Sequence, residues 1–115
     1  MIVEPTPIPD LLVLTPERFE DERGWFTTTW DVRDMAARGL PHTFVQHSHS
    51  LSRRTGTVRG LHFQVAPHAQ AKLVRCGQGR LYDVAVDLRP GRTFGTWFGM
   101  ELSAADGRML FIPEG

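Results

Sequence analysis

The chain has 115 residues, enough for one domain with a hydrophobic core but not for two. Its 13 basic and 13 acidic residues balance to zero net charge, which argues against a nucleic-acid binder that relies on a basic face. The single Cys76 excludes an internal disulfide and a cysteine-rich zinc cluster. The chain has no run long enough to span a membrane, and its start, MIVEPTPIPD, lacks the order of a secretion signal, so we expect a cytoplasmic protein.

The first regular element predicted along the chain is a helix. Asp31 is its N-cap, residues 32–38 form its body, and Gly39 and Pro41 stop it. Apolar residues at every second position then predict six strands, at 42–52, 58–65, 71–76, 80–89, 95–102 and 108–113. Residues 77–79 (GQG) are typical of a hairpin connection, and residues 103–107 of a turn or short helical loop. This spacing indicates a single domain, residues 1–115, built as a β-sandwich or barrel.

Side-chain alternation assigns faces to two of these strands. In residues 80–89 one face carries Val84, Val86 and Leu88, and the other carries Asp83, Ala85 and Asp87. A face with two carboxylates is usually solvated and less often lines a polar cavity. In residues 71–76, Lys72 shares a face with Val74 and Cys76, so it points inward if that face covers the core. An inward lysine must be paired or must hold a ligand.

The stretch RGLHFQ, residues 59–64, places Arg59 and His62 three positions apart. Strand alternation would send these two side chains to opposite faces. A bulge at Gly60 would bring both to one face.

Metal binding and nucleophilic catalysis have weak support. His47 and His49 have the spacing of two metal ligands, but His62 is followed by Gln64 and no Glu occurs in the next dozen residues. His42 and His68 adjoin proline-bearing turns and are expected to be solvated. Cys76 is expected to be a buried, unreactive thiol. The sequence has neither a nucleophile elbow nor a glycine-rich phosphate loop.

An acid–base and anion-binding set remains. It consists of Arg23, Arg59, His62, Lys72 and Asp83. Each of them alone is typical of a surface charge. As a group they favour a polar site, because three of them would lie inward on neighbouring strands.

Seven blocks resemble, in order and spacing, the dTDP-4-dehydrorhamnose 3,5-epimerase family, and together they cover nearly the whole chain. The blocks are FEDERGWF (19–26), FVQHSHS (44–50), VRGLHFQ (58–64), AQAKLVRC (69–76), YDVAVDLR (82–89), TFGTWFGMELSA (93–104) and FIPEG (111–115). The resemblance implies an all-β, cupin-type jelly roll (a double-stranded β-helix) that needs no metal or other cofactor. It also implies a homodimer with exchanged N-terminal strands, so that each site draws on both subunits.

The resemblance implies a role for each candidate. His62 is similar to the general base that removes a proton next to the C4 ketone of a dTDP-4-keto-6-deoxyhexose, and Lys72 to the cation that stabilises the resulting enolate. Arg23 and Arg59 match the diphosphate clamp. Phe19 and residues Gln46, His47 and Ser48 match positions that hold the thymidine and the sugar. Asp83 completes the expected catalytic set.

The chain departs from the family pattern in three places. Thr28 stands where members usually have an acidic substrate contact, and Gln46-His47-Ser48 stands where they usually read Gln-Asp-Asn. Members also continue past IPEG for about another half-domain, which supplies a further substrate-binding histidine, the general-acid tyrosine and an aspartate that orients the base. The one tyrosine here, Tyr82, matches no catalytic position.

Three functions therefore stay open. The first is epimerisation at C3, C5 or both of a dTDP-4-keto-6-deoxyhexose in rhamnose-like deoxysugar biosynthesis. The second is non-catalytic binding of a dTDP-sugar, and the third is a metal-dependent cupin activity.

Overall fold

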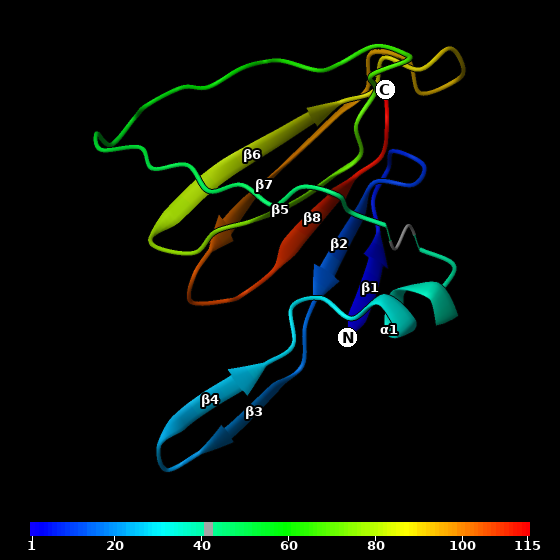
Figure 1. Ribbon diagram of the computed structural model, residues 1–115. Helices are drawn as coiled ribbons and strands as arrows, with labels where there is room; N and C mark the ends of the chain where they lie inside the picture. The colour runs from blue at the N-terminus through cyan, green and yellow to red at the C-terminus, as the bar shows by residue number, and fades with distance from the viewer. Residues whose placement is uncertain (41–42) are drawn as a thin grey trace. The chain divides into compact units, whose positions relative to one another are not determined.

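The computed structural model describes residues 1–40 and 43–115. They divide into two compact units, which we describe separately. The first comprises Met1–Thr27 and Phe63–Gly115, and the second comprises Thr28–His62. Strands dominate the described residues, and among them no helix is long and apolar enough to cross a membrane (Figure 1).

The largest sheet of the first unit has four antiparallel strands. They are β1 (Ile2–Pro5), β2 (Leu12–Thr15), β8 (Met109–Ile112) and β5 (Lys72–Arg75), in that spatial order. Strand β8 is central: Leu12 of β2 lies opposite Phe111, and Lys72 of β5 lies opposite Ile112. Strands β1 and β5 are the edges of this sheet.

Two hairpin-like sheets complete the first unit. Strands β3 (Arg18–Asp21) and β4 (Gly24–Thr27) pair through a two-residue turn. Strands β6 (Arg80–Val86) and β7 (Trp97–Ser103) pair over their whole length. Figure 1 shows β3 and β4 extending away from the four-stranded sheet.

The core joins the four-stranded sheet to β6 and β7, because both sheets contribute apolar side chains to one cluster. Its buried members are Ile8, Leu11, Val13, Ala85, Met100, Leu102 and Leu110, and Val74, Cys76, Phe98 and Ile112 pack against them. Leu14 and Met109, on the opposite face of the four-stranded sheet, are also fully buried.

The second unit contains the single described helix, α1 (Val32–Ala37). The Asp31 carboxylate accepts hydrogen bonds from the backbone N–H groups of Arg33 (2.8 Å) and Asp34 (3.1 Å), as an N-cap does. Gly39 follows the helix with a positive φ of 67°. The predicted N-cap is confirmed, and the helix ends one residue earlier than predicted. Pro41 and His42, including the expected solvated position of His42, lie outside the described residues.

Four of the six predicted strands are confirmed as β5 to β8. The predicted strand 80–89 ends at Val86. The Asp87 N–H still donates to the Thr96 carbonyl opposite it, but the Asp87 carbonyl accepts from the Gly95 N–H, so the pairing does not continue in register. The turn at 103–107 is also confirmed. The period-two analysis missed β1 to β4, because each is only four residues long and β1 ends in Pro5.

The two predicted strands at 42–52 and 58–65 are wrong for the described residues in those ranges. Residues 43–65 contain no strand. Their apolar side chains alternate, but a strand also requires a neighbouring backbone with which to form hydrogen bonds. Within the described chain, residues 43–65 pair with no strand. Gly60 is therefore not a bulge, although its φ of 96° does require glycine.

Two further predictions are wrong, one about the connection at residues 77–79 and one about the face of β6 that is exposed to solvent. Residues 77–79 do not connect a hairpin, because β5 pairs with β8 whereas β6 pairs with β7. The carboxylate face of β6 is the inner one. Ala85 and Asp87 are buried and Asp83 is half-buried, whereas Leu88 is exposed. Burial of that face is possible because Asp87 pairs with Arg89 and Ala85 fills the core.

Candidate active site

Two polar side chains project from the inner faces of neighbouring parts of the first unit. Lys72 shares a face of β5 with Val74, which packs against the core cluster, so the predicted inward face is confirmed. Asp83 shares the inner face of β6 with the core residue Ala85. Both charged side chains therefore lie beside the hydrophobic core, where the dielectric is low and a nearby charge acts strongly.

The hydrogen-bonding capacity of this pair is largely unused. The Asp83 Oδ2 atom is buried and accepts no hydrogen bond from the described residues. Burial raises the pKa of the Asp83 carboxyl, while the Val84 backbone N–H and the positive charge of Lys72 oppose that rise. Lys72 in turn has no ion pair within 4.0 Å in the part of the chain that is described. A cation kept available in this way can stabilise an anion that forms nearby.

The hairpin of β3 and β4 carries two more candidates. Phe19 lies opposite Phe26, and the two side chains are exposed (58% and 67%). Arg23 occupies the turn and forms an ion pair with Asp21. Arg18 fixes the base of the hairpin, since its Nη1 donates to the Ala105 carbonyl (2.6 Å).

The second unit carries the remaining candidates, all of them exposed. The Arg59 guanidinium donates through Nε to Ser52 Oγ (3.1 Å) and through Nη2 to the Leu51 carbonyl (3.0 Å). An ideal Cβ on Gly60 would lie 3.1 Å from His62 Nδ1, so a side chain at position 60 would crowd the imidazole as well as strain the backbone.

Within residues 46–49, side chains two apart interact. Gln46 Nε2 donates to Ser48 Oγ (3.1 Å), and the His47 and His49 rings have centroids 4.8 Å apart. Thr28 follows β4 directly and is exposed. The structure thus brings Lys72 near Asp83 and places Phe19 and Arg23 on the same hairpin. Arg59, His62 and residues 46–48 belong to the second unit.

The match to known proteins covers nearly all of the chain. Residues 5–115 match the family model described as dTDP-4-dehydrorhamnose 3,5-epimerase. The chain belongs to this family. The dTDP-4-dehydrorhamnose 3,5-epimerase of Salmonella typhimurium is 50% identical over 117 residues, an alignment that covers all of this chain and 63% of that protein. The chain therefore spans less than two thirds of that relative's length.

Solved structures of family members have the same fold over this span. The Bacillus anthracis epimerase, crystallised with TDP and PPi bound, is 44% identical with a TM-score of 0.95, covering 99% of this chain and 66% of that one. The Legionella pneumophila epimerase, in complex with dTDP-4-keto-L-rhamnose, is 38% identical with a TM-score of 0.90, covering 99% and 61%. The expected all-β, cupin-type fold is confirmed for the part of the family fold that this chain covers.

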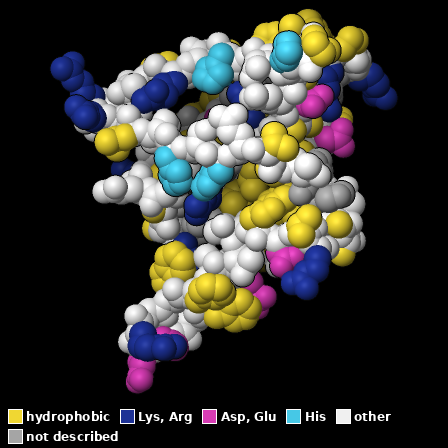
Figure 2. Space-filling view, viewed as in Figure 1, with side chains coloured by type: hydrophobic (Ala, Val, Ile, Leu, Met, Phe, Trp, Pro, Cys, Tyr) yellow, Lys and Arg dark blue, Asp and Glu magenta, His cyan; other side chains and the backbone are white. Residues whose placement is uncertain are grey.

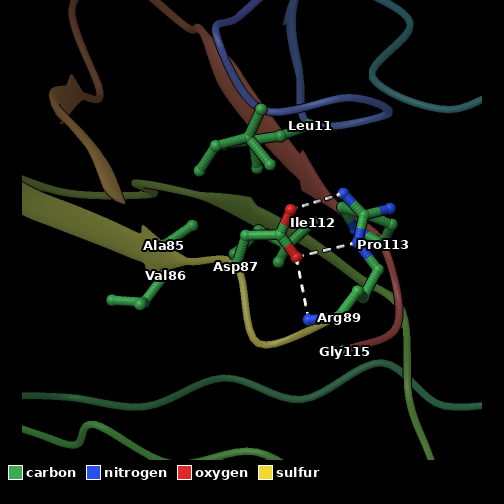
Figure 3. Close-up of a pocket in the computed structure, with 9 residues that line it drawn as sticks. Leu11, Ala85, Val86, Asp87, Arg89, Ile112, Pro113 and Gly115 are labelled. Atoms are coloured by element: carbon green, nitrogen blue, oxygen red, sulfur yellow. Dashed lines mark hydrogen bonds and ion pairs between the residues drawn. The ribbon is translucent and has the colours of Figure 1, made fainter. Parts of the chain in front are cut away.

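Sequence reasoning missed one buried ionic cluster in this family member. The Asp87 side chain, 1% exposed, accepts hydrogen bonds from Arg89 Nε (2.9 Å) and from Thr93 Oγ1 (2.7 Å). Arg89 also donates to the Pro9 carbonyl (2.7 Å) and to Asp10 Oδ2 (3.3 Å). Figure 3 shows this guanidinium beside Asp87 in a small pocket near Gly115. Because Arg89 is already surrounded by protein acceptors, the cluster is structural, and the D-x-R spacing was its one signal in the sequence.

Among the described residues, no group of three or more His, Cys, Asp or Glu side chains lies close enough together to hold a metal ion. The half-buried Cys76 thiol donates to the Gln78 carbonyl (3.2 Å) and packs against the core.

Proposed function

We propose that this protein epimerises C3, C5 or both of a dTDP-4-keto-6-deoxyhexose in rhamnose-like deoxysugar biosynthesis. The observation that carries the proposal is the placement of Lys72 beside Asp83 at the hydrophobic core. Lys72 forms no ion pair with the described residues, so its charge is available to an anionic intermediate. Residues 5–115, which include both side chains, match the epimerase family.

In the proposed reaction, each inversion removes one proton from the carbon and delivers another to its opposite face. His62 removes the proton from the carbon next to the C4 ketone, and the electron pair of the broken C–H bond delocalises onto the ketone oxygen as an enolate. The Lys72 ammonium stabilises this negative charge, and Asp83 belongs to the same catalytic group. A general acid then delivers a proton to the opposite face of the carbon, which restores the ketone and inverts the centre.

The remaining candidates are proposed to hold the substrate. Arg23 and Arg59 bind the diphosphate, because a guanidinium can donate two hydrogen bonds to one phosphate. Phe19, Thr28, Gln46, His47 and Ser48 contact the nucleotide and the sugar. The exposed hairpin that carries Phe19 and Arg23 supports a homodimer in which N-terminal strands are exchanged. A cytoplasmic location agrees with the free thiol of Cys76.

The experiment that tests the proposal follows deuterium incorporation. A dTDP-4-keto-6-deoxyhexose is incubated in deuterated water with the 115-residue chain, with its His62→Ala variant, and with a chain extended to the length of the relatives. Proton NMR then measures exchange and inversion at C3 and C5. We expect exchange that requires His62, and inverted product at a useful rate from the extended chain. A His68→Ala variant, which removes another exposed histidine, should exchange like the parent chain.

Each alternative has its own signature. A binding module would bind dTDP in calorimetry, with affinity falling about ten- to a hundredfold in Arg59→Ala, but neither chain length would exchange protons. The paired rings of His47 and His49 are the observation that favours a metal-dependent cupin. Elemental analysis would support that activity if the purified protein held one metal ion per chain and a His47→Ala, His49→Ala double variant held none.

A further inference from the structure

Asp21, the last residue of β3, binds hydrogen-bond donors of Arg23 that a phosphate could otherwise use. Arg23 Nε donates to Asp21 Oδ2 (3.1 Å), Arg23 Nη2 donates to the same oxygen (2.5 Å), and the Arg23 backbone N–H donates to Asp21 Oδ1 (2.8 Å). The carboxylate therefore occupies the Nε–Nη2 edge of the guanidinium, one of the two edges that can bind a phosphate bidentately. Figure 2 shows basic and acidic side chains together at the tip of this hairpin.

Arg59 differs from Arg23 in the charge of its partners. Its Nε–Nη2 edge is also occupied, but by the Ser52 hydroxyl and the Leu51 carbonyl, which are neutral. Both guanidinium groups are thus held in place, and no described residue occupies the Nη1–Nη2 edge of either. Arg59 forms no ion pair with the described residues, whereas Arg23 pairs with the Asp21 carboxylate.

The ion pair between Arg23 and Asp21 lies on the surface, where it can affect the binding of a phosphate. The Arg23 side chain is 85% exposed and the Asp21 side chain 49% exposed, so an incoming diphosphate can reach the guanidinium but meets the Asp21 carboxylate beside it. The hydrogen bonds from Arg23 also lower the pKa of Asp21, a carboxyl group that is ionised at neutral pH in any case.

We propose that Asp21 weakens the binding of a nucleoside diphosphate at Arg23 and thereby speeds its release. This inference rests on the proposed function, in which Arg23 contacts the diphosphate. Binding energy that holds substrate and product equally tightly does not accelerate the chemical step and delays product release. A carboxylate beside Arg23 lowers the net positive charge that this arginine offers to a phosphate, while the guanidinium keeps its fixed position.

The test compares dTDP binding by calorimetry and dTDP dissociation by stopped-flow in matched variants of the 115-residue chain. Asp21→Asn removes the negative charge but retains an Oδ1 acceptor for the Arg23 backbone N–H, so the turn is preserved. Glu22→Gln removes the same charge from the adjacent exposed residue, which forms no ion pair or hydrogen bond in the described structure. Arg23→Ala, alone and combined with Asp21→Asn, completes the cycle.

We expect Asp21→Asn to tighten dTDP binding about two- to fivefold, as for an exposed ion pair, mainly through slower dissociation. Glu22→Gln should give less than half of this gain, and Asp21→Asn should give none in the Arg23→Ala background. Pyrophosphate should show the same gain as dTDP, and thymidine should show none. Equal effects of Asp21→Asn and Glu22→Gln would overturn this inference alone, whereas a parent chain that does not bind dTDP would overturn the proposed function with it.

Discussion

Asp83 and Asp87 lie on one face of the chain around β6, yet their environments move their pKa values in opposite directions. Burial raises the pKa of Asp83, whereas the hydrogen bonds from Arg89 hold the pKa of Asp87 well below its usual range. The difference follows from their partners. The Arg89 guanidinium donates hydrogen bonds to both carboxylate oxygens of Asp87. Asp83 Oδ2 accepts no hydrogen bond from the described residues. Asp87 is thus suited to stabilise the fold, and Asp83 to act at a site.

Replacing Asp87 should therefore destabilise the protein in a pH-dependent way. Because the folded-state pKa is lowered, the carboxylate stabilises the fold above the ordinary aspartate pKa of about 3.9, and this contribution is lost as the pH falls toward the folded-state pKa. We expect Asp87→Asn to lower the free energy of unfolding by about 1.5–3 kcal/mol at pH 7, and by less below about pH 4. Urea denaturation at pH 7 and pH 3 measures both values.

The control for this substitution is Asp10→Asn. Asp10 contacts the same guanidinium, but its side chain is 75% exposed, so its loss should change the unfolding free energy by about 0.5 kcal/mol or less. If the cost of Asp87→Asn were the same at pH 7 and pH 3, the carboxylate charge would not be what stabilises this cluster.

At the scale of elements, the hairpin of β3 and β4 depends on one arginine. Arg18 donates to the carbonyls of Ala105 (2.6 Å) and Ala104 (3.3 Å), and its guanidinium lies 4.5 Å from the centre of the Trp25 ring. Otherwise the hairpin is mostly exposed. Arg18 therefore links a projecting element to the turn between β7 and β8, both within the first unit.

Removing this link should loosen the hairpin without unfolding the core. We expect amide hydrogen exchange across residues 19–26 to be about threefold faster or more in Arg18→Ala, with unchanged exchange in β8. Arg18→Lys keeps the charge near Trp25 but cannot donate to both carbonyls, so it should exchange nearly as fast. Arg80→Ala, which removes an exposed arginine 4.0 Å from Glu101, is the control and should leave the hairpin unchanged. Unchanged hairpin exchange in Arg18→Ala would show that other contacts hold it.

The elements that the sequence predicted correctly are those with local signals. Asp31 marks the start of α1 because a cap requires only the next turn of the chain. Strands β5 to β8 alternate clearly, and the inward face of Lys72 follows from its neighbour Val74. The pairing of β5 with β8 and the ion pair of Asp87 with Arg89 could not be predicted, since both depend on which strands and loops meet in the folded chain. Alternation at 43–65 was misleading for the same reason.

At the scale of the whole molecule, several large apolar side chains of the described residues are exposed. The β3–β4 hairpin exposes an aromatic pair, Phe19 and Phe26. In the second unit Val45 is 96% exposed and Val58 88% exposed. Two exposed aromatic side chains on one hairpin are typical of an interface between subunits.

We therefore predict that the protein is a homodimer and that the hairpin helps to form it. The parent chain should sediment at twice its mass of 13.0 kDa, because burial of Phe26 on the partner removes a large apolar area from water. Phe26→Ser should shift the sedimentation equilibrium toward monomer. Phe94→Ser is the matched control, since it removes a phenyl ring of similar exposure (64%) from the connection between β6 and β7, outside the hairpin. If both variants sedimented like the parent dimer, contacts elsewhere would have to hold the subunits together, and Arg23 and Phe19 would lose the route by which the proposed exchange brings them to a partner's site.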